Sequence, residues 1–140
     1  MIFWDVNIWV YAFRKDSPFH DISRNTILHT LEGGEPFLFC PHVAASFLRL
    51  VTNPHIFEEP SSLKEAWEFI DVLESHPNSR FAEVDRMTFG VFKYLVQVHL
   101  SKGNTIPDAF LAALAIRNNC TLVTTDQGFY EYKGLEVRLI

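Results

Sequence analysis

The stretch IFWDVNIWVYAF, residues 2–13, places an aspartate where a short apolar strand gives way to an apolar helix. Residues 2–4 are predicted to form a buried strand, and the residues from Asn7 onward are predicted to turn helical. Asp5 lies between the two among apolar neighbours, so its burial requires hydrogen-bond partners or a cation. The stretch therefore predicts a strand–helix unit with a polar group at its junction.

Strand-like and helix-like segments alternate along the rest of the chain. Further strands are expected at residues 36–40, 80–84, 121–125 and 135–140. Helices are expected from Ser17-Pro18 to Gly33-Gly34, from Pro41 to Asn53-Pro54, from a Ser62/Glu65 capping box through residue 74, from an Asp85 cap through Leu100, and over residues 105–119. Because parallel strands need crossover connections, this alternation predicts an α/β fold with a parallel sheet and helices on both faces.

Length and composition narrow the class of protein. With 140 residues, 48% of them hydrophobic and 21% charged, the chain is expected to fold as one domain, residues 1–140. The net charge of −5 and the pI of about 5.6 exclude a global basic field, so activity on nucleic acid has to rest on a local patch or on metal ions. Cys40 and Cys120 are expected to be buried and reduced. Without a signal peptide or a stretch of membrane-span length, we expect a cytoplasmic protein with no membrane contact.

Three aspartates are expected at one edge of the sheet. Asp5 follows the first predicted strand and Asp126 follows the strand at residues 121–125. Asp108 lies on the core-facing side of the helix at residues 105–119, whose first turn opens at the same edge. Ligand sites of parallel sheets lie beyond the carboxyl ends of the strands, so we expect the three carboxylates to converge there.

Each aspartate also has an ordinary structural interpretation. Asp108 forms a capping-box-like pair with Thr105, Asp126 can start a turn, and Asp5 can accept hydrogen bonds from the amides of the following turn. If the carboxylates do converge, two of them about 4 Å apart repel by roughly 4 kcal/mol, which favours protonation or a bound cation. An acidic, all-oxygen ligand set suits Mg²⁺ or Mn²⁺ better than zinc, and such ions support hydrolysis of a phosphodiester.

Four segments in this order resemble the PIN-domain ribonucleases, and within them the toxins of VapBC-type toxin–antitoxin pairs. The segments are DVNIWVYAFRKDSPFH (5–20), FLRLVTNPHIF (47–57), NTIPDAFLAALAI (104–116) and TLVTTDQGF (121–129). The resemblance implies a three-layer α/β/α fold around a central, mostly parallel five-stranded sheet. It also implies Mg²⁺- or Mn²⁺-dependent cleavage of a structured RNA of the translation machinery, such as a tRNA, inhibition by a small cognate antitoxin, and homodimers.

The resemblance also assigns roles to residues. Asp5, Asp108 and Asp126 are similar to the family's metal-binding, catalytic aspartates. The supporting or substrate-binding positions of the family fall on Asn7, Asn104, Thr124, Arg49 and Ser46. For Arg49 a surface salt bridge is an equally good interpretation.

Two positions depart from the family pattern. Where many members carry a glutamate this chain has the run Ala45-Ser46-Phe47, and Gly128 stands where many carry a second aspartate. Three acidic ligands remain where the fuller pattern has four or five, so the site is expected to bind either one or two metal ions. Two alternatives therefore accompany the nuclease: a weakly active or inactive PIN-fold interaction module, and phosphoryl transfer through Asp5, for which Asn7 stands where a second aspartate is usual.

The remaining candidate residues carry weaker signals. The six histidines, at positions 20, 29, 42, 55, 76 and 99, show no ligand spacing and are assigned to surface or loop roles. Core packing is the expected use of the many aromatic residues, with a dimer contact through Trp9 and Phe13 as the alternative. Candidate cationic contacts to phosphate are Arg14, Lys15, Arg24, Arg49 and Lys102.

Overall fold

The computed structural model describes all residues from 1 to 140 and contains one five-stranded sheet. The strands are β1 (Ile2–Trp4), β2 (Phe37–Phe39), β3 (Ser79–Phe81), β4 (Thr121–Thr124) and β5 (Glu136–Leu139), in the order β3-β2-β1-β4-β5. Every neighbouring pair is parallel. The predicted parallel sheet is confirmed, and β1 and β4 are its central neighbours.

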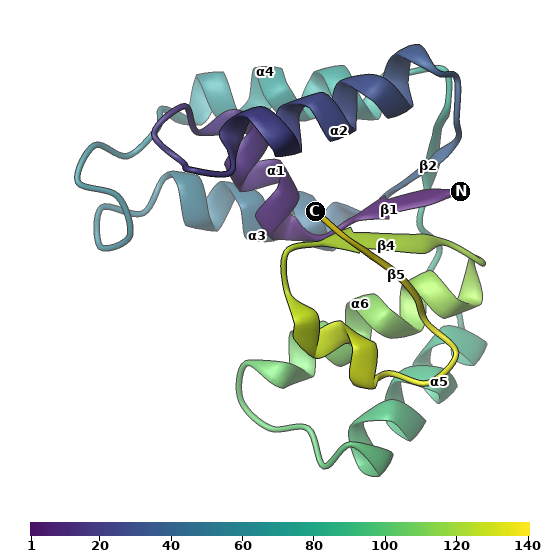
Figure 1. Cartoon of the computed structure of the whole chain (residues 1–140). Helices are drawn as coiled ribbons and strands as arrows, with labels where there is room; N and C mark the ends of the chain where they lie inside the picture. The colour runs from purple at the N-terminus through teal and green to yellow at the C-terminus, as the bar shows by residue number, and fades with distance from the viewer.

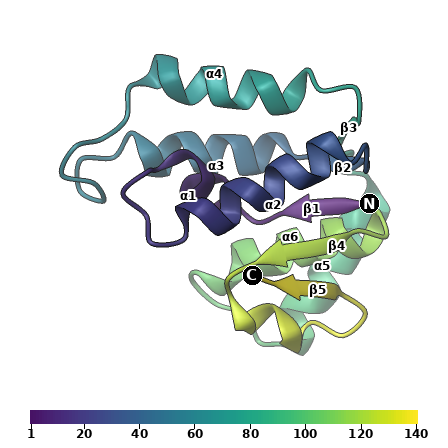
Figure 2. The same ribbon diagram turned by 45° about the horizontal axis from the view of Figure 1, so that its top comes forward.

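Helices cover both faces of the sheet (Figure 1). They are α1 (Val6–Phe13), α2 (His20–Glu32), α3 (Pro41–Val51), α4 (Leu63–Glu74), α5 (Arg86–Val98), α6 (Thr105–Arg117) and the short 3₁₀ helix η1 (Gln127–Glu131). The first four lie on one face, and α5, α6 and η1 lie on the other, as Figure 2 also shows. The expected three-layer α/β/α fold is therefore confirmed.

An aromatic layer packs the helices of the first face onto the sheet. We use this name for Trp9 and Phe13 of α1, Phe39 of β2, Phe47 of α3 and Phe69 of α4. The ring of Trp9 lies 5.7 Å from Phe39 and 6.0 Å from Phe47, centroid to centroid, and Phe47 lies 5.2 Å from Phe69. Trp9 is only 1% exposed, so the alternative of a dimer contact through Trp9 is wrong and core packing is its role.

Local signals predict most helix ends correctly. The capping box of Ser62 and Glu65 is present, and Asp85 caps α5 by accepting a hydrogen bond from the Thr88 amide at 2.7 Å. The start predicted at Ser17 is wrong: the Ser17 hydroxyl accepts from the Phe19 amide in a local turn, and α2 begins at His20. Such a turn satisfies the same hydroxyl as a helix cap does, so the sequence pattern does not separate the two.

The third strand is displaced from its predicted place. β3 covers residues 79–81 rather than 80–84, because its ladder is set by pairing with β2, Ser79 opposite Phe37 and Phe81 opposite Phe39. Both cysteines are buried and free, as expected. None of the helices combines the length and the apolar character that crossing a membrane requires.

Candidate functional site

A polar edge forms where β1 and β4 end side by side. Trp4 pairs with Val123 in the ladder, and the next residues along the two strands are Asp5 and Thr124. The Thr124 hydroxyl donates to Asp5 Oδ2 at 2.8 Å and accepts from the Asp126 amide at 3.0 Å. Thr124 therefore joins the two aspartates, and we call Asp5, Thr124 and Asp126 the polar edge.

Asp5 is a buried carboxyl, with 3% of its surface exposed. Its pKa is raised to about 6: burial is the largest cause and the charges of Asp108 and Asp126 add to it, while the hydrogen bonds from Thr124 and the Val6 backbone act in the opposite direction. The backbone also fixes the residue, because the Asp5 amide donates to the Val123 carbonyl at 3.0 Å. The position of Asp5 is thus fixed, and a neighbouring cation would stabilise its charged form.

Asp108 enters the site from the first turn of α6, where it is half-buried. Burial, and then the charge of Asp126, raise the pKa of this carboxyl. The capping interpretation is wrong, because the Thr105 hydroxyl bonds the Lys102 backbone instead and α6 has no side-chain cap. The three aspartates are therefore electrostatic neighbours.

Asp126 is exposed and does begin a turn, as its ordinary interpretation predicts. Its Oδ1 accepts from the Gly128 amide at 2.7 Å at the start of η1. A Cβ on residue 128 would lie 3.0 Å from that oxygen, so an acidic side chain at this position requires the Asp126 carboxylate to move. The absence of a side chain at Gly128 therefore allows the Asp126 carboxylate to take this orientation.

An acidic pocket of about 290 Å³ opens at this end of the sheet. Its lining residues come from α6, from the loop between α5 and α6, and from η1 and the residues that follow β4: His99, Ser101, Thr105, Asp108, Asp126, Gly128, Phe129, Glu131 and Tyr132. Burial raises the pKa of the Tyr132 hydroxyl, and the charges of Asp108, Glu131 and Asp126 add to this. Sequence reasoning missed His99, Glu131 and Tyr132, because no motif or spacing links them to the aspartates.

The donor set of this region suits a hard cation, since all its acidic ligands are carboxylates. In the arrangement of the side chains, no group of three His, Cys, Asp or Glu residues is close enough together to hold a metal ion. Asp108 and Asp126 line the pocket, whereas Asp5 is buried and outside its lining, with one oxygen bonded to Thr124. A metal ion held by all three aspartates therefore requires their carboxylates to come closer together than they are here.

The other predicted site residues lie on neighbouring elements without hydrogen bonds to the aspartates. Asn7 is half-buried in the first turn of α1, and Ser46 is half-buried in α3. Asn104 precedes α6 without capping it by its side chain. Arg49 is exposed on α3 and takes part in none of the salt bridges, so its ordinary interpretation is not realised. Among the predicted site residues, hydrogen bonds and mutual charge effects link Asp5, Thr124, Asp126 and Asp108.

None of the candidate cations is among the residues that line the acidic pocket. Lys102 is nearest in the chain: it is exposed in the loop between Ser101 and Thr105, which both line the pocket, and its backbone bonds the Thr105 hydroxyl. Arg14 is occupied, since it donates to Asp16, to the Glu59 carbonyl and to Ser61, and lies over the ring of Phe57. Lys15 and Arg24 line an apolar groove of about 280 Å³ between α1, α2 and α4, with a floor that includes Leu28, Leu31 and Phe69. We call this the α1/α2/α4 groove.

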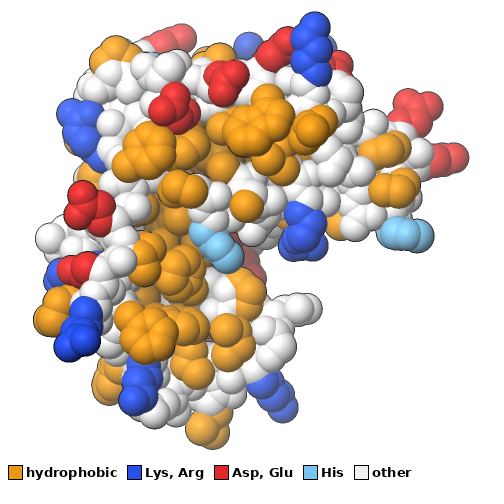
Figure 3. Space-filling view, turned by 180° about the vertical axis from the view of Figure 1, so that it is seen from behind, with side chains coloured by type: hydrophobic (Ala, Val, Ile, Leu, Met, Phe, Trp, Pro, Cys, Tyr) orange, Lys and Arg blue, Asp and Glu red, His pale blue; other side chains and the backbone are white.

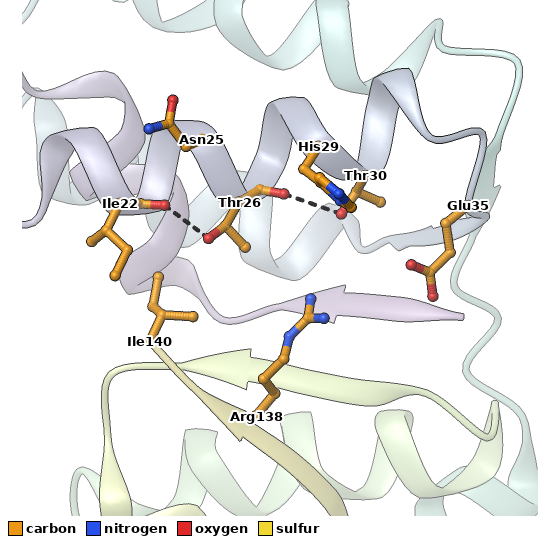
Figure 4. A pocket seen from close by; sticks show the side chains of 8 residues that line it. All are labelled: Ile22, Asn25, Thr26, His29, Thr30, Glu35, Arg138 and Ile140. Atoms are coloured by element: carbon orange, nitrogen blue, oxygen red, sulfur yellow. Dashed lines mark hydrogen bonds between the residues drawn. The ribbon is translucent and has the colours of Figure 1, made fainter.

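A wider pocket, of about 630 Å³, lies between α2 and β5 (Figure 4). Arg138 and Glu35 line it, but its two threonine hydroxyls are already used within the helix: Thr26 donates to the Ile22 carbonyl and Thr30 to the Thr26 carbonyl. With a single carboxylate side chain in its lining, this pocket has no acidic ligand set.

Hydrophobic side chains gather over the face of the molecule seen from behind in Figure 3. The exposed apolar residues of α4, β3 and α5 include Trp67, Phe81, Met87 and Phe89. A groove of about 510 Å³ between α3 and α4 adds Ala45 and Leu48 to this surface. We call these residues the apolar face.

Comparison with known proteins adds an independent line of evidence. A family model described as PIN domain matches residues 2–135. Ribonuclease VapC43 of Mycobacterium tuberculosis is 35% identical over 134 residues, covering 96% of this chain and 91% of the relative. Ribonuclease VapC31 of the same species is 33% identical over 135 residues, covering 96% and 95%.

Two solved structures share the fold over nearly their whole length. VapBC2 of Rickettsia felis, bound to a DNA fragment from its promoter, superposes with a TM-score of 0.71 at 22% identity, covering 99% of this chain and 98% of that one. VapC20 of Mycobacterium tuberculosis, a sarcin-ricin loop cleaving toxin, gives 0.69 at 17% identity, covering 99% of each.

Proposed function

This chain belongs to the PIN-domain family, and from that premise we propose that it is an endoribonuclease toxin that hydrolyses phosphodiester bonds in RNA. The observation that carries the proposal is the polar edge: Thr124 joins Asp5 to Asp126 by two hydrogen bonds, and Asp108 faces the same pocket. Its curated relatives over more than nine-tenths of their length are named ribonucleases. Fold and relatives therefore point to one chemistry.

We propose that Asp5, Asp108 and Asp126 hold Mg²⁺, with Mn²⁺ as a substitute. When bound, such an ion lowers the pKa of a water ligand and neutralises charge on the leaving oxygen. The protein's own part is to orient the carboxylates: Thr124 fixes one oxygen of Asp5, and the Gly128 amide fixes one oxygen of Asp126. Burial, and after it the charges of the neighbouring carboxylates, raises the pKa of Asp5 and of Asp108, so a bound cation would stabilise the charged forms of both side chains.

We propose a structured RNA of the translation machinery, a tRNA or another, as the substrate, and the cytoplasm as the place of action. The fold neighbour VapC20, a sarcin-ricin loop cleaving toxin, supports a structured target for this chain as well. The net charge of −5 supports a local rather than a global mode of RNA binding.

A small antitoxin is the proposed inhibitor. The solved neighbours include toxin–antitoxin pairs, VapBC2 and FitAB. The α1/α2/α4 groove offers an apolar floor bordered by Lys15 and Arg24, which suits an amphipathic segment with acidic residues at its flanks. A homodimer through the apolar face is proposed as well, since large exposed apolar side chains that gather on one face mark protein contacts.

The test is cleavage of total cellular RNA by the purified protein in Mg²⁺, in Mn²⁺ and in EDTA. Asp5→Asn serves as the variant, because it keeps the size of the side chain and removes its charge. We expect discrete, metal-dependent cuts by the wild type and their loss in the variant, by about 100-fold or more. Circular dichroism of both proteins verifies that each is folded.

Three other outcomes overturn the proposal in distinct ways. Equal cleavage by Asp5→Asn places the activity elsewhere. No cleavage and no Mn²⁺ binding in calorimetry supports the inactive interaction module instead. A trapped phosphate on Asp5 supports phosphoryl transfer, the alternative in which the carboxylate is a nucleophile.

A further inference from the structure

The acidic pocket has an unusual set of charges for a site that binds RNA. Three of its side chains are carboxylates, Asp108, Asp126 and Glu131, and neither Lys nor Arg is among its lining residues. These carboxylates repel a phosphodiester that enters unless a cation or hydrogen-bond donors compensate. Contacts to phosphate oxygens also position a nucleic acid, so donors in the wall would serve the substrate beside any bound metal. His99 is the one lining side chain with ring N–H donors and the capacity to carry positive charge.

The position of His99 is fixed by the fold. Its backbone amide donates to the Leu95 carbonyl at 3.0 Å, which places it at the end of α5. Its ring packs edge-on against Tyr132, with 4.8 Å between centroids and an interplanar angle of 63°. Tyr132 is itself 7% exposed, and its hydroxyl donates to the Thr105 carbonyl at 3.3 Å. The imidazole therefore rests on a buried support that is tied to the first turn of α6.

The ring nitrogens of His99 make no hydrogen bond within the protein. Those of His20 and His76 take part in hydrogen bonds with the Tyr11 carbonyl and the Asn78 amide. His99 takes part in no such bond, although it is half-buried and faces the pocket. The imidazole is a packed ring with free nitrogens, and it shares its pocket with carboxylates that a polyanion has to approach. It is therefore suited to contacting the ligand.

We propose that His99 contacts the bound RNA by donating a ring N–H to a phosphate oxygen beside the cleaved bond. The inference rests on the proposed nuclease function and adds a substrate-binding residue to it. Tyr132 is the positioning residue, because it holds the imidazole at the pocket wall. His99 binds substrate, so its loss should weaken RNA affinity and raise KM rather than lower kcat.

The experiment compares His99→Phe and His99→Gln with the wild type. Phenylalanine keeps an aromatic ring against Tyr132 and removes both nitrogens, whereas glutamine restores an N–H donor. His55→Phe is the matched control, since His55 is an exposed histidine on the loop after α3. The probe is fluorescently labelled bulk tRNA in Ca²⁺, an ion that oxygen ligands bind, and affinity is read by fluorescence anisotropy.

We expect His99→Phe to bind the labelled tRNA about tenfold more weakly, with His99→Gln between it and the wild type and His55→Phe unchanged. Melting temperatures of all four proteins should agree. Equal affinities of wild type and His99→Phe, including no measurable binding by either, overturn the inference, as does a loss that glutamine does not relieve at all.

The two proposals fail separately in this design. If the wild type binds RNA in a His99-dependent way but cuts nothing, the nuclease function fails and the RNA contact stands. If the wild type cuts RNA and His99→Phe retains its KM, the nuclease stands and the inference fails.

Discussion

The aromatic layer packs on the sheet and the polar edge lies at the end of its central strands, and burial of a side chain has opposite consequences in the two regions. In the aromatic layer, Phe47 is fully buried and surrounded by Trp9, Phe13 and Phe69, so loss of water contact stabilises the fold. At the polar edge, Asp5 is almost as buried, and loss of water raises its pKa to about 6. One region stabilises the protein, while the other opposes folding at neutral pH and provides chemistry.

Stability and function can therefore be changed separately, the first through the aromatic layer and the second through the polar edge. The two regions meet at α1: Asp5 of the polar edge immediately precedes this helix, and Trp9 of the aromatic layer lies one turn later. A substitution in the aromatic layer should change unfolding in every condition. One at the polar edge should change it only where charge or metal is involved.

The largest effect is expected from Phe47→Ala, which empties the centre of the aromatic layer. Removing a fully buried phenylalanine should lower the free energy of unfolding by about 3–5 kcal/mol, measured by urea denaturation. Phe89→Ala is the control, since Phe89 is 58% exposed, and it should change stability by less than about 1 kcal/mol. Similar losses of unfolding free energy in the two variants would show that the aromatic layer does not stabilise the fold more than the surface does.

The next effect concerns pH. The raised pKa of Asp5 means that the folded protein holds a proton that the unfolded chain, with the ordinary value of 3.8, has released. Its stabilising contribution is present below about pH 4 and is lost as pH rises through about 6, a decrease of roughly 3 kcal/mol. Asp108, whose pKa is also raised, acts in the same direction.

Urea titrations of wild type and Asp5→Asn between pH 4 and 7 measure this contribution. The wild type should lose stability relative to the variant as pH rises. Saturating Mn²⁺ should restore part of the loss, since a ligand that binds only the folded state stabilises it. Parallel curves without metal would show that Asp5 is not the group responsible.

A smaller effect is expected from Thr124→Val, which removes the two hydrogen bonds that link Asp5 and Asp126 at the polar edge. Valine keeps the shape but removes the donor to Asp5 and the acceptor for the Asp126 amide, so stability should fall by about 1–3 kcal/mol and cleavage by roughly tenfold. Thr125→Val is a matched control, because the half-buried neighbour makes no such bonds. Equal losses in both variants would mean that the bridge has no special role.

The smallest effect is expected from Gly128→Ala. The added Cβ would lie 3.0 Å from Asp126 Oδ1 and should shift that carboxylate, lowering cleavage a few-fold with stability changed by less than about 1 kcal/mol. Gly90→Ala is the opposite control, since a Cβ there meets nothing within 4 Å inside α5, and it should stabilise by about 0.5–1 kcal/mol with unchanged cleavage. Unchanged cleavage by Gly128→Ala would separate the glycine from the orientation of Asp126.

The sequence by itself determined the alternation of strands and helices, the parallel sheet and the edge on which Asp5 and Asp126 lie. These follow from local patterns, because apolar period, caps and the crossover rule act over short distances along the chain. The register of β3 and the start of α2 differ from the sequence prediction, since strand pairing and a local turn decide them.

Only the tertiary structure decided which groups complete the site. Thr124 and Asp5 are 119 residues apart and meet because β1 pairs with β4. His99 and Tyr132 meet because the end of α5 lies against the segment after η1, and no sequence spacing records that contact. The physical reason is that a side chain's partners across the fold are set by packing and register, which depend on the whole chain at once.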